Sequence, residues 1–406
     1  MPDQPFDVTV FGATSFVGQI LTRYMAETYG HGGDVRWAIA GRSEAKLNEL
    51  KESLGPTVVG LPVIVADAAD EEALTGMVKG TRVVISTVGP YALYGSLLVK
   101  LCATLGTDYV DLTGEPQWIR RMIDAHEEDA LRSGARIVHC CGFDSIPSDL
   151  GVHFLEAEAM KRFGAPCTTV KMGVKAMKGG ASGGTVASMM NAMKEMGENP
   201  DLKREMKNPF SLCPREHGFK ARQRNVQGAV FDKDFGRWLA PFVMAAINTR
   251  VVHRSNALRD KAYGKEFRYD ESVFTKGRWS ATGMTLGLGG FMVLAAMGPT
   301  RGLLERFVVP KPGEGPSPEA QEKGFYDLRF YGETDKGDIL RAKVTGDRDP
   351  GYGSTSKMLA QAGLALAGLA KADLAGGFWT PATAMGDPLI DRLQKHAGLT
   401  FEIVED

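Results

Sequence analysis

The first chemistry that the sequence suggests is the binding of a pyrophosphate, at two glycines that follow a run of β-forming residues. In DVTVFGATSFVGQ, Gly12 ends that run and Gly18 comes six residues later. A pyrophosphate binds backbone N–H groups at the positive end of a helix, where no side chain blocks its approach. Ser15 stands where a third glycine is common, and its hydroxyl is a candidate to bond a phosphate oxygen. Glycines at this spacing also occur in turns that bind nothing. The turn predicts a dinucleotide site made by Gly12, Ala13, Thr14, Ser15, Phe16, Val17 and Gly18.

The end of the next β-rich run indicates which dinucleotide is bound. VRWAIAGRSEAKL ends its apolar part in Gly41, Arg42 and Ser43. In NAD sites a carboxylate ends this strand and binds the ribose 2′-hydroxyl, whereas an arginine accommodates a 2′-phosphate. Here glycine replaces the carboxylate, Arg42 can pair with a phosphate, and Ser43 can cap the next helix and bind the same phosphate. We therefore expect NADP(H) in preference to NAD(H). An arginine that is merely exposed after a strand is the alternative.

Two further β-rich runs end in residues that suit the same ligand. Asp67 follows LPVIVA and is a candidate to accept a hydrogen bond from the adenine amino group, with capping of the next helix as the alternative. The fourth run is followed by a small turn, which we expect to wall the nicotinamide ribose, formed by Thr87, Val88, Gly89 and Pro90. Tyr91 comes next and is a predicted catalytic residue, with Tyr94 and His139 as weaker candidates. Plain packing of a buried tyrosine is the alternative for Tyr91.

The segment CCGFDSIPSDLG follows the sixth β-rich run, and ligands of parallel sheets bind at the carboxyl ends of strands. Gly142 permits a close approach to the cofactor. Asp144 offers a carboxyl group and is the second predicted catalytic residue. Ser145 and Ser148 add polar groups, although either serine could instead cap a helix that begins near Asp149.

These residues need a parallel sheet to bring them to one edge, and the first 140 residues have the pattern of one. Short β-rich runs alternate with amphipathic stretches, which is typical of a doubly wound α/β fold. The expected strands are Asp7–Phe11, Val35–Ala40, Pro62–Val65, Val83–Thr87, Tyr109–Asp111 and Ile137–Cys140. The expected helices are Gly18–Tyr29, Glu44–Ser53, Glu71–Val78, Ser96–Leu105 and Gln117–Ser133.

After Gly142 the pattern changes to long polar loops, β-rich pieces and separate helical stretches. Thr168–Val174 and Tyr326–Glu333 are expected strands, the second in a hairpin that turns at Asp335–Gly337. A helical pattern around Val186–Met196 contains methionines that could line an apolar channel, although such a stripe is more often core: Met189, Met190, Met193 and Met196. These pieces predict a second, α+β substrate domain.

The C-terminal part contains an Ala/Leu-rich helical pattern, GSTSKMLAQAGLALAGLAK, with Ser354 or Thr355 as the expected cap. Its near-continuous apolarity indicates burial against the first sheet. The expected organisation is a dinucleotide-binding domain over 1–150, an inserted α+β substrate and lipid-binding domain over 151–350, and a helical segment over 351–406 that returns to the first domain.

The composition of the chain argues against several classes of function. A net charge of -1 gives no sign of a nucleic-acid partner, and 43% hydrophobic residues are ordinary for a globular protein. The five cysteines have no metal or disulfide spacing, so we expect no metal site and a reducing, cytoplasmic location. The chain starts without the basic segment of a secretory signal.

Two stretches bear on partners. Ser280–Thr300 has no charged residue, and we expect a buried or lipid-facing helical segment, with peripheral membrane attachment as the alternative. Asp201–Arg224 is rich in cations, which is usually a solvated face. It is also a candidate to dock an acidic acyl carrier domain or a phosphopantetheine phosphate. A homodimer is left open.

Taken together, the motifs resemble the saccharopine dehydrogenase-like oxidoreductases and, within them, the actinobacterial trans-acting enoyl reductases. The segments that carry the resemblance are VFGATSFVGQ, WAIAGRS, STVGPY, DLTGE, CGFDSIPSDLG, GGASGGT, RWSATGMTLGLGG, GDRDPGYGSTSKM and TPATAMGD. Ser15 departs from the glycine that is common in the family.

The resemblance implies a Rossmann-type domain that binds NADP(H) or NAD(H), and a mixed α/β domain that closes over the nicotinamide. It also implies reduction of an α,β-unsaturated acyl chain, small or carrier-bound, that a separate polyketide synthase makes. Hydride transfer at a C–N or C=O bond is one alternative, and a nucleotide-binding lipid-surface protein with little turnover is another.

Overall fold

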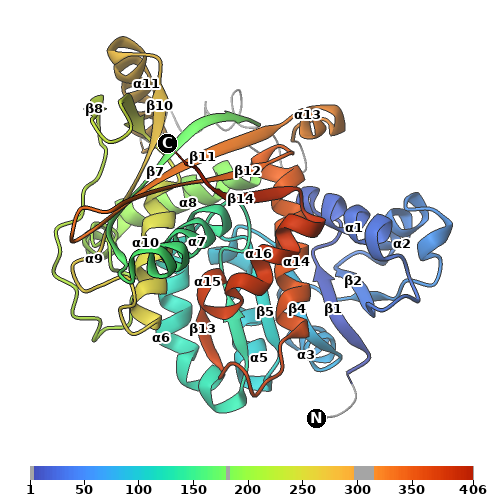
Figure 1. Ribbon diagram of the computed structural model, residues 1–406. Coiled ribbons are helices and arrows are strands. Elements are labelled where there is room, and N and C mark those ends of the chain that lie inside the picture. The colour runs from blue at the N-terminus through green and yellow to red at the C-terminus, as the bar shows by residue number, and fades with distance from the viewer. Residues whose placement is uncertain (1–3, 180–182, 297–314, 406) are drawn as a thin grey trace.

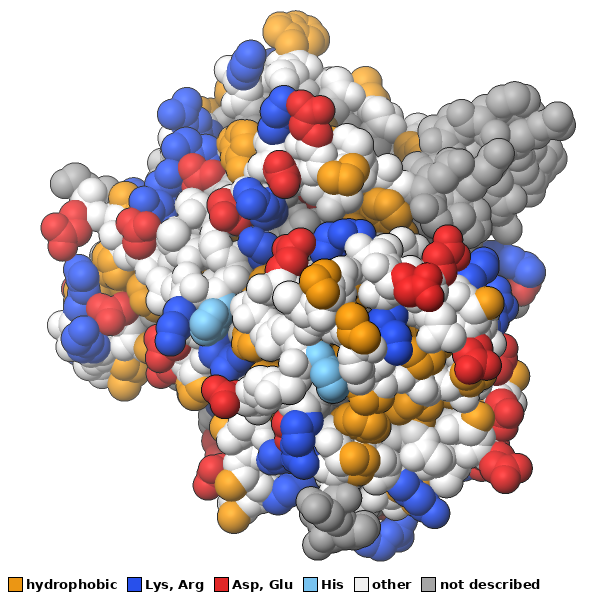
Figure 2. Space-filling model, turned by 90° about the vertical axis from the view of Figure 1, so that its right-hand side faces the viewer, with side chains coloured by type: hydrophobic (Ala, Val, Ile, Leu, Met, Phe, Trp, Pro, Cys, Tyr) orange, Lys and Arg blue, Asp and Glu red, His pale blue; other side chains and the backbone are white. Residues whose placement is uncertain are grey.

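The computed structural model describes residues 4–179, 183–296 and 315–405, and their strands form two sheets of seven strands each (Figure 1). In Figure 1 the second sheet lies above the first, and the N-terminus is at the bottom. Lys and Arg side chains alternate with Asp and Glu side chains over the face drawn in Figure 2, which agrees with the net charge of -1.

The first sheet is built mostly from the first 140 residues. Its strands are β1 (Phe6–Phe11), β2 (Trp37–Gly41), β3 (Val63–Val65), β4 (Thr81–Ser86), β5 (Asp108–Asp111), β6 (Arg136–Val138) and β13 (Gly377–Trp379). The helices between them are α1 (Phe16–Tyr29), α2 (Glu44–Ser53), η1 (Pro56–Val58), α3 (Glu71–Lys79), α4 (Tyr91–Tyr94), α5 (Ser96–Leu105) and α6 (Pro116–Ser133). All pairs are parallel in the order β13-β6-β5-β4-β1-β2-β3. The expected doubly wound sheet is confirmed.

Asp70, and not Asp67, caps α3. The Asp70 carboxylate accepts hydrogen bonds from the N–H groups of Glu72 and Ala73, both at 3.0 Å. Asp67 lies three residues earlier and accepts from the N–H of Ala69 at 2.9 Å. The alternative reading of Asp67 as a helix cap is therefore wrong, because the helix begins one turn later than that reading requires.

The second sheet is mixed. Its strands are β7 (Cys167–Lys178), β8 (Val230–Asp232), β9 (Arg237–Pro241), β10 (Arg268–Thr275), β11 (Phe325–Thr334), β12 (Ile339–Gly346) and β14 (Leu399–Ile403). Helices α7 (Ile146–Phe163), α8 (Gly183–Glu198), α9 (Pro200–Glu205), α10 (Ala245–Leu258), α11 (Arg278–Ala296) and α13 (Pro318–Glu322) belong to this part. The order is β14-β12-β11-β7-β10-β9-β8, in which β7 and β10 are parallel and the other pairs are antiparallel. The predicted hairpin is β11 and β12, and the expected α+β second part is confirmed.

The C-terminal segment contributes to both sheets. It contains the π-helical turn η2 (Pro350–Ser354), then α14 (Thr355–Gly368), α15 (Pro381–Ala384) and α16 (Gly386–His396). As predicted, α14 packs on the first sheet, against β1, β4 and β5, and it also contacts α1. Two short strands were not expected: β13 joins the first sheet beside β6, and β14 joins the second beside β12. The domain boundaries at 150 and 350 stay predictions.

Ser354 occupies the predicted N-cap position of α14, but no side chain caps the helix there. Ser354 precedes the helix, yet its hydroxyl makes no cap and instead lies 3.0 Å from the Tyr326 hydroxyl. The Thr355 hydroxyl donates to the Pro350 carbonyl at 2.8 Å. The capping carboxylate is that of Asp349, which is fully buried and accepts from three consecutive N–H groups of η2. The π-helical turn extends the helix backward and moves the cap to its own start.

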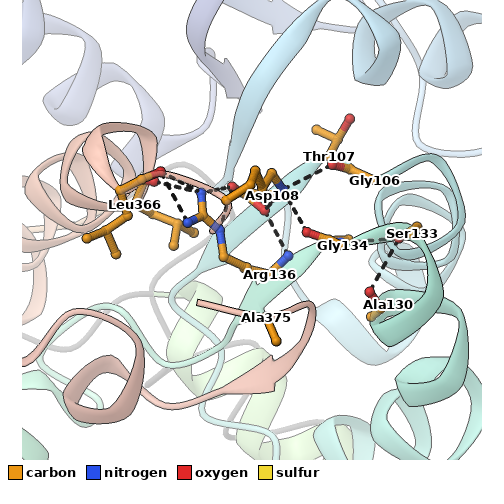
Figure 3. A network of polar contacts seen from close by, with 12 residues as sticks. Gly106, Thr107, Asp108, Ala130, Ser133, Gly134, Arg136, Leu366 and Ala375 are labelled. Carbon is orange, nitrogen blue, oxygen red and sulfur yellow. Dashed lines mark hydrogen bonds and ion pairs between the residues drawn. The ribbon is translucent and has the colours of Figure 1, made fainter. Parts of the chain in front are cut away.

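A buried ion-pair network fixes the C-terminal segment to the first sheet (Figure 3). The Arg136 guanidinium on β6 donates to the Asp108 carboxylate on β5 at 2.5 Å and to the Leu366 carbonyl at the end of α14 at 3.0 Å. Both charged side chains are almost fully buried. Lys371, just beyond α14, donates to Asp108 at 2.5 Å and to the Gly134 carbonyl at 2.8 Å. The network therefore joins two strands to the segment that crosses them.

We expect Arg136→Met to lower the free energy of unfolding by about 3–5 kcal/mol, because it removes one partner of a buried pair. The measurement is urea denaturation followed by circular dichroism. Arg132→Met is the control: Arg132 pairs with Asp129 at the surface, its side chain is 74% exposed, and a change within about 1 kcal/mol is expected. Equal stability of the parent and Arg136→Met would contradict this account.

Candidate functional site

The candidate site lies at the carboxyl edge of the first sheet. The chain runs from β1 outward to β2 and β3 and then returns to β4 on the other side of β1. Ligands of doubly wound sheets bind where the strand order reverses in this way. The turns that follow β1, β4, β5 and β6 all end at this edge, and they carry the residues predicted from the sequence.

The two glycines of the first turn are required by close packing. Gly12 has φ +86°, and a Cβ atom there would lie 2.7 Å from the Thr87 hydroxyl oxygen. A Cβ atom on Gly18 would lie 2.1 Å from the carbonyl oxygen of Gly12. Only glycine lets α1 start this close to the strand end, so the helix N-terminus lies directly at the sheet edge.

Ser15 closes the same turn with its hydroxyl group. The Oγ atom of Ser15 accepts from the N–H of Gly18 at 2.9 Å and lies 3.0 Å from the Thr87 hydroxyl. Thr87 in turn donates to the Gly12 carbonyl at 2.9 Å. A helix cap therefore explains why serine stands where glycine is common. The predicted bond from Ser15 to a phosphate stays a prediction.

The end of β2 leaves an unpaired cation at this edge. Gly41 is buried, and the hydroxyl of Ser43 caps α2 by accepting from the N–H of Lys46 at 3.4 Å. Arg42 between them is exposed. Over the part of the chain that the structure describes, its guanidinium has no hydrogen bond and no ion pair. Asp67, the predicted adenine contact, is also exposed.

Tyr91 lies at the edge, but its hydroxyl faces the backbone beneath. The residue is 3% exposed, and its hydroxyl donates to the Ser86 carbonyl at 3.0 Å. Burial raises the pKa of Tyr91 well above the ordinary value. Its N–H and that of Ala92 donate to the Glu115 carboxylate at 2.9 and 3.0 Å, so Glu115 fixes the start of α4. The catalytic role of Tyr91 stays a prediction, whereas Tyr94 is half exposed.

Asp144 places a carboxyl group at the edge between two glycines. A Cβ atom on Gly114 would lie 3.2 Å from one carboxylate oxygen of Asp144, and a Cβ atom on Gly142 would lie 3.1 Å from the other. The side chain keeps some exposed surface. Desolvation raises the pKa of Asp144 to about 7, with a contribution from the charge of Asp111. This carboxyl group is therefore able to gain or lose a proton near neutral pH.

Ser145 is the N-cap residue of α7, as the alternative reading proposed, but its side chain makes no capping hydrogen bond, and Ser148 lies inside the helix. The helix α7 begins at Ile146, before Asp149, and neither serine side chain caps it. The Ser145 hydroxyl donates instead to the amide oxygen of Asn248 on α10 at 3.0 Å. Asn248 donates to the Glu271 carboxylate on β10 at 2.9 Å. The residue after Asp144 is thus tied to the second sheet.

A buried carboxylate–imidazole pair lies under the edge; it joins His139, a weaker catalytic candidate of the sequence, to Asp111, which was not predicted. His139 Nδ1 is 2.7 Å from the Asp111 carboxylate, which is fully buried and also accepts from the N–H groups of Thr113 and Cys140. The sequence signal was the motif DLTGE, with acids on both sides of a glycine at a strand end, and it contains Asp111 and Glu115. Their partners come from other elements, so the motif alone did not assign their roles.

The C-terminal segment covers the first turn. The rings of Phe16 and Tyr352 are 5.0 Å apart in an edge-to-face arrangement. The N–H of Phe143 donates to the Thr355 hydroxyl at 2.9 Å. Apolar groups therefore stand over the helix N-terminus where the pyrophosphate is predicted to bind.

The methionines that could line an apolar channel or pack as core lie on α8, and the channel stays a prediction. Met190 is buried, and Met193 and Met196 are partly exposed, while the side chain of Met189 lies outside the described residues. Glu195 of α8 pairs with Arg121 of α6 at 3.0 Å, which holds the helix beside the edge.

The residues at the edge fit a phosphorylated dinucleotide. The turn offers a helix N-terminus without a blocking Cβ atom, and Arg42 offers a charge without a partner in the described residues. No group of three or more His, Cys, Asp or Glu suited to a metal ion occurs in the described ranges.

Comparisons with known proteins agree with this geometry. Residues 8–138 match the saccharopine dehydrogenase NADP binding domain. The chain is 42% identical over 413 residues to a Mycobacterium tuberculosis protein provisionally named a trans-acting enoyl reductase, covering 98% of this chain and 97% of the relative. It is 39% identical over 412 residues to the trans-acting enoyl reductase of Mycobacterium bovis, covering 96% of each.

Among solved structures, apo saccharopine dehydrogenase (L-Glu forming) from Saccharomyces cerevisiae is similar in fold, with a TM-score of 0.53. Its sequence is 15% identical, and the match covers 98% of this chain and 99% of that one. The likeness extends over both sheets and says nothing about substrate. With an NADP binding domain at residues 8–138 and relatives that match from end to end, this chain belongs to the trans-acting enoyl reductases, NADP-dependent oxidoreductases with a saccharopine dehydrogenase-like fold.

Proposed function

We propose that this chain reduces the carbon–carbon double bond of an α,β-unsaturated acyl thioester with NADPH. When bound, the nicotinamide supplies the hydride for the β-carbon. The α-carbon then needs a proton, and the enolate oxygen needs hydrogen-bond donors. The observation that carries the proposal is the Asp144 carboxyl group, which lies at the same sheet edge as the dinucleotide turn and has a raised pKa of about 7.

The residues that would hold the cofactor lie at the carboxyl edge of the first sheet. The turn from Gly12 to Gly18 binds the pyrophosphate at the start of α1, where its two glycines place no Cβ atom. Arg42 binds the adenosine 2′-phosphate, because it is exposed and unpaired within the described chain. Asp67 accepts from the adenine amino group, and the Thr87–Pro90 turn walls the ribose next to the nicotinamide.

Asp144 delivers the proton to the α-carbon. A carboxyl group with a pKa near the working pH is both protonated often enough and acidic enough for general-acid catalysis. Tyr91 is the second candidate, but its hydroxyl must first leave the Ser86 carbonyl to reach a substrate. We therefore assign proton transfer to Asp144. Tyr91 is assigned a supporting role beneath the nicotinamide ring.

The partner is an acyl chain on the carrier of a separate synthase. The name of the relatives indicates action in trans, with a polyketide synthase as the proposed source of the substrate. Lys220 and Arg222 are exposed cations of the 201–224 segment, whereas Arg215 pairs with Asp124 at 2.7 Å. We propose that this segment docks the acidic carrier or the phosphate of its pantetheine arm.

We place the reaction in the cytoplasm, with peripheral contact to a membrane. In the described ranges, no helix has the length and hydropathy that crossing a bilayer requires. The uncharged Ser280–Thr300 stretch corresponds to α11 up to Ala296, and its last four residues lie outside the described ranges.

The direct test of the proposed reaction uses NADPH that carries deuterium at the transferred position of C4. Incubation with a 2-alkenoyl thioester should oxidise the cofactor and leave the label on the β-carbon of the saturated product, as read by mass spectrometry and NMR. NADH should react more slowly. Label on the carbonyl carbon would instead indicate carbonyl reduction, and absence of cofactor oxidation with carrier-bound and free thioesters alike would refute the proposal.

Asp144→Asn should lower kcat for this substrate by about 10²-fold or more and leave NADPH affinity unchanged, because it removes the proton donor. In the parent, kcat should fall as the pH rises above about 7, where Asp144 loses its proton. Because the folded state holds this proton more tightly than the unfolded chain, the stability of the parent falls between about pH 4 and pH 7, and the variant lacks that loss.

Glu156→Gln is the matched control. Glu156 is a buried carboxyl group on α7 with a pKa raised to about 8 by desolvation, and it accepts from the N–H of Cys167 at 2.9 Å. It lies away from the sheet edge, so its replacement should leave the pH profile of kcat unaltered. If Asp144→Asn and Glu156→Gln gave the same pH profile as the parent, Asp144 would not be the donor.

A further inference from the structure

The helix α11 presents large apolar side chains to solvent along one stripe. Trp279, Leu286 and Val293 are 84%, 69% and 59% exposed. They are spaced seven residues apart, which places them on the same side of a helix over about 21 Å. In Figure 1 this helix stands at the top of the molecule, away from the first sheet.

The inner face of α11 carries small residues at both ends, with Leu288 and Met292 partly buried between them. Ala281 and Ala295 are fully buried, and the helix packs against β9 and β10. An ordinary surface helix turns its large apolar residues inward and its charged residues outward. In α11 large apolar residues also lie on the exposed face, and Arg278 at its start is its single charged residue. Such a helix face is suited to an apolar surrounding.

Glycines on the exposed face add to this argument. A Cβ atom on Gly283, Gly287 or Gly290 would meet nothing within 4 Å, so packing within the chain does not require glycine there. Glycine in an exposed helix costs about 1 kcal/mol relative to alanine, so water alone favours this helix poorly. A further contact over the stripe would supply the missing stabilisation.

Cations surround the base of the stripe. Phe231 on β8 is 50% exposed. Exposed cations lie near it on the β8–β9 hairpin and at the start of α11: Lys233, Arg237, Lys276 and Arg278. The acids of the hairpin do not balance them, because Asp232 and Asp234 both bind Lys171. Figure 2 shows hydrophobic side chains at the apex of the molecule with Lys and Arg side chains beside them.

We propose that the stripe of Trp279, Leu286 and Val293 docks on the surface of an anionic lipid bilayer. An apolar helix face flanked by cations and a tryptophan is the composition of an interfacial anchor, in which apolar side chains enter the acyl boundary and cations meet lipid phosphates. A second copy of the chain would bring the same cations and no acid to meet them. The docking deepens the proposed membrane contact by naming its surface, and it does not depend on the reductase reaction.

The test is co-sedimentation of the full chain with vesicles of phosphatidylcholine, with and without phosphatidylglycerol. The parent should bind the anionic vesicles. The triple variant Trp279→Ser, Leu286→Ser, Val293→Ser should bind them at least ~10-fold more weakly, because it removes the inserted side chains. Lys276→Glu with Arg278→Glu should abolish the preference for phosphatidylglycerol.

The matched control replaces three apolar side chains that are exposed elsewhere: Val59→Ser, Val65→Ser and Leu131→Ser. It should bind vesicles like the parent. All variants should bind NADPH and turn over a water-soluble enoyl thioester like the parent, which shows that they fold and separates docking from catalysis. Absence of vesicle binding by the parent would overturn the proposal, as would an equal loss in the control triple. A concentration-dependent dimer that the stripe variant dissociates, without vesicle binding, would assign the face to a second copy.

Discussion

The closeness of α1 to the end of β1 is the constraint on which the site depends. Gly18 packs against the Gly12 carbonyl, where any Cβ atom would clash, and Thr87 donates to the same carbonyl from the end of β4. One turn thereby fixes the helix N-terminus and the neighbouring strand end together. The remaining polar groups at the edge, including Asp144, lie at further strand ends of the same parallel sheet. The proposed cofactor site and the proposed proton donor therefore lie on the same sheet edge.

The second sheet is coupled to this edge in two ways. Ser145 bonds Asn248, and Asn248 bonds Glu271 on β10, so the position of Asp144 depends on both sheets. The C-terminal segment crosses from the second sheet to the first, where Arg136 holds the end of α14. The cover over the dinucleotide turn thus belongs to a segment that is bound to both parts of the chain.

Much of the first sheet could be predicted from the sequence, because its strands are apolar runs separated by turn signals. The predicted ends of strands β1 to β6 differ from the observed ends by two residues at most, as in β2. The strands β13 and β14 could not, because they are short and exist only through distant partners. At the site, strand ends gave the positions of Gly12, Arg42 and Asp144. Predictions of a side-chain cap failed where the side chain bonds a distant residue instead, as the Ser145 hydroxyl donates to Asn248.

Calorimetric titration of the pure protein with NADPH and NADH shows whether Arg42 binds the 2′-phosphate. We expect NADPH to bind more tightly than NADH. Arg42→Ala should weaken NADPH binding by about 10–100-fold and leave NADH binding nearly unchanged, because only NADPH carries the phosphate. Lys46→Ala, on the exposed start of α2, should leave both affinities unchanged. Equal affinity of the parent for the two nicotinamides, unaltered in Arg42→Ala, would contradict this expectation.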